Sequence, residues 1–272
     1  MKKIPMIILY VILFAASVVW IYPYIWMLLS SFKPTNEIYG GFLPSRFTLD
    51  NYRFILEAAD KMERPFIQAL GNSVFISVTV TFGVLVTSAL VGFGLSRLSF
   101  KGRNVIFNFI IFQMIFPGFL FIVPLYVLIR NLGLIDTRTA LILPSLVSAW
   151  GVFMFTQSFR AVPNEYLEAA RMDGANDLWI ITKVLIPLTS STVSIVGLFT
   201  FIGIWDNFMW PLIVVSDYSK MPLSVLLASF NMQYGSYLGP VLAGSVLQTM
   251  PMVVIFLVFR KYFLQGISMS LK

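Results

Sequence analysis

The chain has 272 residues, of which 58% are hydrophobic and only 11% are charged, and its formal net charge is +7. Soluble domains carry about 25% charged residues, so this composition excludes an ordinary soluble domain and indicates a membrane protein. The basic residues stand beside apolar runs rather than on a basic face with interleaved aromatic residues, which argues against a nucleic-acid partner. The chain contains no Cys and no His, which excludes disulfides, metal ligation by these residues and imidazole catalysis.

Six long apolar stretches predict an all-α polytopic membrane protein with one transmembrane domain over residues 1–272. A helix needs about 20 residues to cross a hydrocarbon core of roughly 30 Å. The first stretch is too long, and ends in too many aromatic residues, for a signal peptide. The predicted spans cover about 5–29, 66–95, 104–129, 139–159, 186–205 and 238–259.

The segments between the spans carry most of the charge. A polar loop at 33–65 is expected outside, with a short helix near 47–56 that is capped near Asp50 or Asn51. The second span is rich in Gly, Ser and Thr, which predicts close helix packing. In the third span, a kink is expected near Pro117 and Gly118 because proline removes an amide donor.

The distribution of basic residues predicts the orientation. Arg97, Lys101 and Arg103 form a short turn without any acid, which is typical of a cytoplasmic loop. With both termini inside, the predicted cytoplasmic segments hold 11 of the 19 Lys and Arg residues. The positive-inside rule therefore favours cytoplasmic N- and C-termini.

The span cores contain no Asp, Glu, Lys or Arg and no nucleotide-binding loop, so the chain is not expected to be an enzyme or to bind ATP. They carry neutral amides instead, which together with aromatic faces suit a neutral hydroxylated solute such as a sugar. Hydrogen bonding between helices is the more common role of any single amide, and that alternative stays open. The amides are Asn108, Gln113, Gln157 and Gln248.

The stretch from Pro163 to Leu188 is the longest water-compatible segment in the second half of the chain. Its first part predicts a short helix that starts at Pro163 and presents Ala169 and Ala170 as a surface with little side-chain bulk. Gly174 fits a C-terminal cap in the left-handed conformation. A second helix, capped by Asn176 or Asp177, is expected to end before Pro187.

This stretch resembles the signature of the permease subunits of binding-protein-dependent ATP-binding-cassette (ABC) importers: EAA, three residues, Gly, nine residues, Ile-x-Leu-Pro. Glu168, Ala169, Ala170, Gly174 and Pro187 match it, whereas Val184 and Ile186 replace the Ile and Leu. The resemblance implies a type I importer fold and a cytoplasmic coupling loop at 160–185 that docks on ATPase subunits. The residues implied in coupling are Glu165, Glu168, Ala169, Ala170, Arg171, Asp173, Gly174, Ala175 and Pro187.

Further segments resemble the maltose-type carbohydrate branch, in particular its shorter six-span subunit: SFKP, FTLDNY, GLIDT, WDNFMWPL and FLQGI. The resemblance implies a second homologous permease, two cytoplasmic ATPases that hold ATP and Mg, an extracytoplasmic solute-binding protein and a carbohydrate substrate. It also implies the inner membrane of a prokaryote, with no cofactor in this chain. The WDNFMWPL segment adds four candidate contacts for sugar or binding protein, with an aromatic belt as the alternative: Trp205, Asp206, Asn207 and Trp210.

Two other functions stay open at this stage. The signature is shared among importers, so a permease for amino acids, metal ions or phosphonates is an alternative. A polytopic membrane enzyme or an assembly scaffold is the alternative from a different class.

Overall fold

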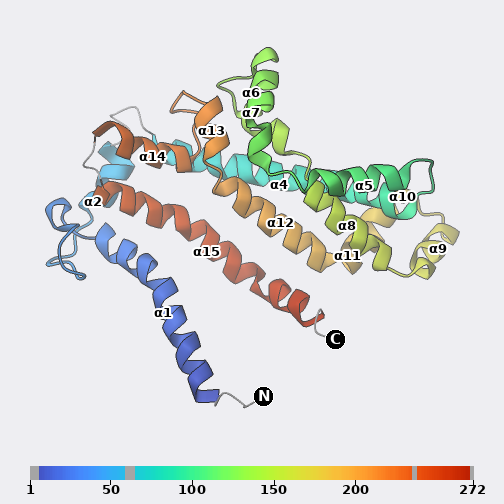
Figure 1. Cartoon of the computed structure of the whole chain (residues 1–272), viewed down its shortest axis with the longest axis horizontal. Coiled ribbons are helices and arrows are strands. Elements are labelled where there is room, and N and C mark those ends of the chain that lie inside the picture. The colour runs from blue at the N-terminus through green and yellow to red at the C-terminus, as the bar shows by residue number, and fades with distance from the viewer. Residues whose placement is uncertain (1–5, 59–64, 235–237, 270–272) are drawn as a thin grey trace. The chain divides into compact units, whose positions relative to one another are not determined.

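In the computed structural model, residues 6–58, 65–234 and 238–269 are described, with the backbone alone for residues 58, 231–234 and 259–269. All regular elements in these ranges are helices (Figure 1). Four helical segments are long and apolar enough to cross a membrane, and the number rises to six if each of two bent helix pairs is one span. The expected all-α membrane fold is confirmed, and its helices accommodate the expected six spans.

The chain divides into two compact units, residues 1–68 with 225–251 and residues 69–224 with 252–272. The single domain expected over residues 1–272 therefore stays a prediction. The first unit contains α1, a short helical region after it, most of α14 and the first part of α15. Their bounds are α1 (Met6–Ser31), η1 (Thr35–Glu37), α2 (Asp50–Arg53), η2 (Phe54–Ala58), α14 (Leu223–Tyr234) and α15 (Leu238–Met269).

A buried amide links the end of α1 to the region that follows it. Asn51 donates from Nδ2 to the carbonyl oxygens of Ser31 at 2.9 Å and of Lys33 at 2.8 Å. Because its amide is engaged there, it does not cap α2, and the cap predicted at Asp50 or Asn51 is wrong. The Thr48 hydroxyl instead accepts from the backbone N–H of Asp50 at 3.1 Å. Residues 59–64 of the loop predicted at 33–65 lie outside the described residues.

The second unit contains most of α4 and all helices up to α13. The bounds are α4 (Phe66–Arg97), α5 (Arg103–Gln113), η3 (Gly118–Phe121), α6 (Ile122–Asn131), α7 (Arg138–Ile142), η4 (Leu143–Ser145), α8 (Ala149–Ala161), α9 (Asn164–Met172), α10 (Asp177–Trp179), η5 (Ile180–Leu185), α11 (Ile186–Leu188), α12 (Ser190–Trp205) and α13 (Met209–Val214). Between α5 and η3 the chain bends by 99°, so the kink predicted near Pro117 and Gly118 is confirmed.

A second bend, of 87°, lies between α12 and the continuous helix that comprises α10, η5 and α11. The helix runs through Pro187 to Leu188, so its predicted end before Pro187 is wrong, and α12 begins at Ser190 rather than at 186. The preceding π-helical turn η5 makes room for a residue without an N–H donor. Thr189 closes the corner, because its hydroxyl donates to the carbonyl oxygen of Leu185 at 2.7 Å.

The helices α4 and α8 approach closely where a glycine faces a serine. A Cβ atom on Gly151 would lie 2.5 Å from the Oγ atom of Ser88, which is fully buried on α4. A larger residue at position 151 would push the helices apart. This contact agrees with the close packing expected from the small residues of α4.

Candidate functional site

The helix α9 ends in a hydrogen-bonded turn centred on Gly174. Gly174 has a φ of 83°, and its N–H donates to the carbonyl oxygen of Arg171 at 3.0 Å. The N–H of Ala175 donates to the carbonyl oxygen of Ala170, also at 3.0 Å. This is the Schellman arrangement, in which a left-handed residue closes a helix, and the predicted glycine cap is confirmed.

A second helix starts directly after this turn. The Oδ1 atom of Asn176 accepts from the N–H of Trp179 at 2.8 Å, so Asn176, rather than Asp177, caps it. The Asp177 carboxylate lies 3.5 Å from the guanidinium of Arg171, and both side chains are about half exposed. Such a pair is worth only about 0–1 kcal/mol, but it links the two helices across the glycine turn.

The two faces of α9 differ in burial. Leu167 and Ala170 are buried, and α9 packs against η5. Because residues three apart share a helix face, Ala170 helps to seat α9 on the protein and is not part of the predicted small-residue surface. The exposed face carries Glu165, Glu168, Ala169 and Asp173. Its surface is therefore acidic and has little side-chain bulk at Ala169.

Arg97, at the end of α4, holds the start of this segment. Its guanidinium donates to the carbonyl oxygens of Phe159 and Val162 and to the Oδ1 atom of Asn164, the first residue of α9. A planar guanidinium offers five donors in a fixed fork, so one side chain can join three acceptors. The sequence interpretation assigned Arg97 only to topology, because its acceptors lie more than 60 residues away.

Arg160, in the last turn of α8, makes the reverse connection. It donates to the carbonyl oxygen of Leu95 at 3.3 Å, and its guanidinium carbon lies 4.6 Å from the centre of the Phe107 ring. An arginine from the end of α4 thus binds carbonyl groups at the end of α8, and an arginine from the end of α8 binds a carbonyl group at the end of α4. Cations near a helix C-terminus are favourable. The reciprocal contacts fix the platform from which α9 projects.

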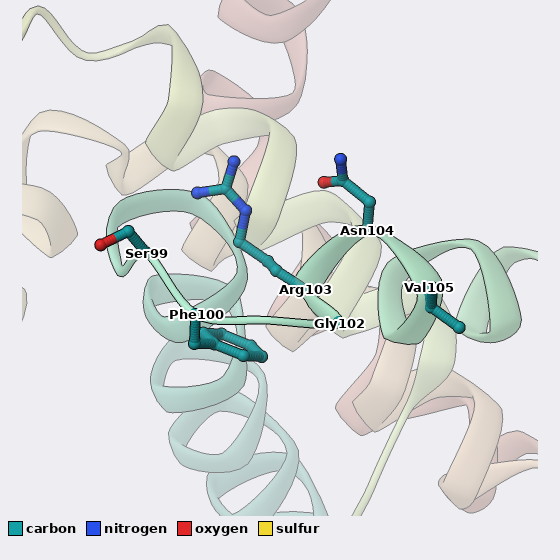
Figure 2. A pocket seen from close by; sticks show the side chains of 6 residues that line it. All are labelled: Ser99, Phe100, Gly102, Arg103, Asn104 and Val105. Carbon is teal, nitrogen blue, oxygen red and sulfur yellow. The ribbon is translucent and has the colours of Figure 1, made fainter.

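The turn between α4 and α5 lines a cavity of about 290 Å³. Figure 2 shows that the side chains of Arg103 and Asn104 extend to one side of this turn, whereas the Phe100 ring and Val105 extend to the other. Val105 is 72% exposed. Such a separation of polar and apolar side chains suits a turn at a membrane boundary.

The neutral amides of the predicted solute path belong to three helices, α5, α8 and α15. Asn108 and Gln113 lie exposed on α5, and Gln157 lies exposed on α8. Gln248 is half-buried on the part of α15 that belongs to the first unit. The structure therefore leaves the three exposed amides as candidates within the second unit.

The WDNFMWPL segment joins α12 to α13, and its two tryptophans are buried. The Trp205 ring stacks on Phe201 with centroids 5.6 Å apart. The Nε1–H group of Trp210 donates to the carbonyl oxygen of Ala140 at 3.0 Å. Asp206 is exposed and Asn207 half-buried. Burial gives the tryptophans a packing role, so the polar pair is better placed to meet a solute or partner.

A charged cluster joins the turn after α6 to the loop after α13. The helix α13 itself packs on α6 and α7 (Figure 1). Asp136, at a φ of 61°, accepts from the N–H groups of Ser216 and Asp217 at 3.0 Å each. Lys220 lies 3.1 Å from the Asp217 carboxylate and 3.7 Å from that of Asp136. Hydrogen bonds from Ser219, together with Lys220, lower the pKa of Asp217 to about 2.

The charges of this cluster hold two loops together rather than a metal ion. Among the residues that the structure describes, no group of three or more His, Cys, Asp or Glu side chains could hold a metal. The hydrogen bond with Asp217 also raises the pKa of Lys220. Both shifts favour the charged forms of Asp217 and Lys220.

The sequence interpretation missed a groove beside the start of α8. Its volume is about 300 Å³, and Trp150 and Phe199 meet edge to face in it, with ring centroids 5.8 Å apart. The available indication was Pro144 early in a predicted span, shortly before a tryptophan. The lining residues are Val84, Ser145, Val147, Ser148, Trp150, Phe199, Thr200, Gly203 and Ile204.

Comparisons with known proteins agree with the geometry. The family described as "Binding-protein-dependent transport system inner membrane component" matches residues 80–269. The arabinooligosaccharides permease protein AraQ of Halalkalibacterium halodurans is 34% identical over 92% of this chain and 90% of its own length. The lactose permease protein LacG of Rhizobium radiobacter is 29% identical over 100% of this chain and 98% of its own length.

A solved structure of the same kind is also similar. A bacterial ABC transporter chain involved in the import of the acidic polysaccharide alginate superposes with a TM-score of 0.86 at 26% identity, and covers 96% of this chain and 97% of its own. The chain therefore belongs to the family of binding-protein-dependent transport system inner membrane components, as a membrane permease subunit of a sugar-importing ABC transporter.

Proposed function

We propose that α9 and the Gly174 turn form the surface on which a cytoplasmic ATPase subunit docks. The observation that carries this proposal is the way the segment is fixed. Arg97 ties its start to α4 and α8, and the Schellman turn closes its end. A segment that transmits force must move as one body, and these contacts make it one.

The corner at Thr189 provides the route from this surface to the membrane helices. The helix from α10 to α11 meets α12 at 87°, so a push on one arm of the corner tilts the other. Thr189 stiffens the corner, because its own carbonyl oxygen also accepts the N–H groups of Thr192 and Val193. In our proposal, closure of the ATPases on ATP moves α9, and α12 responds by alternately opening the path to either side.

The remaining parts of the importer follow from the same proposal. This chain forms half of the path with a second homologous permease, and ATP and Mg are bound by two ATPase subunits. Both termini lie in the cytoplasm of a prokaryote, as the excess of basic residues favours, and the solute-binding protein delivers a carbohydrate from the opposite side. The charged cluster of Asp136, Asp217 and Lys220 then faces that protein.

The test reverses the charge of the exposed face of α9. Glu168→Lys in the complete importer should reduce ATP-driven sugar uptake about tenfold or more, because the changed side chain meets the partner and not this chain. Glu57→Lys, an exposed acid in the first unit, is the matched control and should leave uptake unchanged. Normal uptake by the Glu168→Lys importer, at equal membrane insertion, would refute the docking role.

A further inference from the structure

The span from Arg138 to Ala161 is interrupted between η4 and α8, at residues 146–148. The Leu146 carbonyl oxygen accepts from the hydroxyl of Thr87 at 2.8 Å, and Ser148 caps α8 by accepting from the N–H of Gly151 at 3.1 Å. Non-helical backbone at membrane depth is tolerated only where protein covers it or where it lines a water-filled cavity. Here the interruption lies on the groove that contains Trp150.

The groove combines aromatic and hydroxyl groups. Trp150 is half-buried and Phe199 is 49% exposed, so ring surface is open to the groove. The hydroxyl-bearing residues Ser145, Ser148 and Thr200 line the same space. None of the lining residues is charged. Aromatic faces cover the apolar patches of a sugar ring, and hydroxyls exchange hydrogen bonds with its polar edge.

We propose that this groove contacts the transported saccharide directly and that it accepts uncharged saccharides. The inference rests on the proposed function, in which this chain forms half of the path. A carboxylate that enters the groove would lose water without meeting a cation, whereas a neutral hydroxyl can be paired. The groove therefore disfavours uronic acids, although a similar structure comes from an importer of the acidic polysaccharide alginate.

The exposed amide of Gln157 extends the same contact line. Gln157 follows Trp150 by seven residues, or two helical turns, and so lies on the same face of α8, about 10 Å further along the axis. Met154 lies between them on that face and is half-buried. A saccharide that leaves the Trp150 ring next meets a neutral amide donor and acceptor.

The first test uses the absence of cysteine from the natural chain. Val147 lines the groove and is 65% exposed, so Val147→Cys supplies a thiol there. Maleimide labelling of this chain is followed in the complete importer in nanodiscs with loaded binding protein and ATP. The probes are arabino-oligosaccharides, lactose, trehalose and diacetylchitobiose, with alginate and galacturonate oligomers as acidic probes.

At least one neutral saccharide should slow labelling of Val147→Cys about threefold or more, and the acidic oligomers should not. Val123→Cys, on the exposed side of α6 and outside the groove, is the control and should be labelled at the same rate throughout. Equal labelling with and without every saccharide would overturn the proposal, and would indicate that lipid or the second permease fills the groove. Protection by the acidic oligomers would overturn its charge selectivity.

The second test removes the ring. Trp150→Leu should lower uptake of the protecting saccharide about tenfold, mainly by raising the apparent KM, whereas Trp150→Phe should retain most of it. Trp20→Leu changes a 77% exposed tryptophan on α1 and should have no effect. Unchanged uptake by Trp150→Leu would contradict the proposal. The two proposals fail in different assays: unchanged ATPase stimulation in Glu168→Lys would refute the docking role, whereas unchanged uptake by Trp150→Leu would refute the groove.

Discussion

Substitutions of Gly174 separate backbone strain from contact with a docked partner. Gly174 has a φ of 83°, and a Cβ atom built on it meets no atom of this chain within 4 Å. In the chain alone, Ala at this position therefore carries only the left-handed backbone penalty, about 1–2 kcal/mol. That penalty lowers the population of the closed turn about 5-fold to 30-fold. Asn, which tolerates this conformation, costs less.

The two effects rank three substitutions differently. If strain alone matters, Gly174→Asn is the mildest change, and Gly174→Ala and Gly174→Leu are similar to each other. If an ATPase surface covers the turn, side-chain size decides, and Gly174→Ala is mildest and Gly174→Leu most severe. We expect thermal unfolding of the purified permease to follow the first order, because no side chain of this chain fills the space.

The decisive assay is stimulation of ATPase activity by loaded binding protein in the reconstituted importer. We expect it to follow the second order, with Gly174→Leu almost inactive and Gly174→Ala retaining the most activity. Each variant is compared at equal amounts of assembled complex. If ATPase stimulation follows thermal stability instead, with Gly174→Asn the most active, the turn acts only through its own fold and the docking argument fails.

Two further predictions concern the contacts around the site. Arg97→Lys keeps the charge but loses the guanidinium fork, at about 1.5–3 kcal/mol for each charge-assisted hydrogen bond lost. Amide hydrogen exchange in α9 should therefore accelerate, whereas the control Arg103→Lys should leave it unchanged. Equal exchange in both variants would contradict the anchoring role of Arg97. The folded-state pKa of Asp217, about 2, lies below its ordinary value of 3.8, so its carboxylate stabilises the loop after α13 above about pH 4, and this contribution is lost as the pH falls toward 2. Pepsin should therefore cleave that loop faster as the pH falls from about 4 toward 2, relative to Asp217→Asn, which has no carboxylate to protonate at this position. The same pH response in both proteins would contradict a stabilising role for the Asp217 carboxylate.

The sequence was most informative where a requirement is local. A long apolar run must satisfy its backbone within a helix in lipid, and this alone predicts membrane spans. Gly174 predicted a turn, and the adjacent pair Asn176 and Asp177 predicted a cap, because both features depend on conformations within a few residues. The predicted kink near Pro117 has the same origin, since proline removes a donor wherever it stands.

Contacts between distant residues could not be derived in this way. The guanidinium of Arg97 meets acceptors 62 to 67 residues further along the chain, and only the packing of α4 beside α8 brings them within reach. Ala170 turned inward because α9 rests on η5, although its neighbour Ala169 points outward. Pro187 continued a helix because the turn before it is widened.

The sequence by itself thus determined that this chain is a helical membrane permease with a water-compatible loop of a known signature, since hydropathy and a spaced motif are properties of the chain. Only the tertiary structure decided how that loop is held and where a solute could be met. Trp150 and the interruption near Ser148 lie at the start of α8, whereas Thr200 belongs to α12, and they define a groove only once α8 and α12 lie side by side.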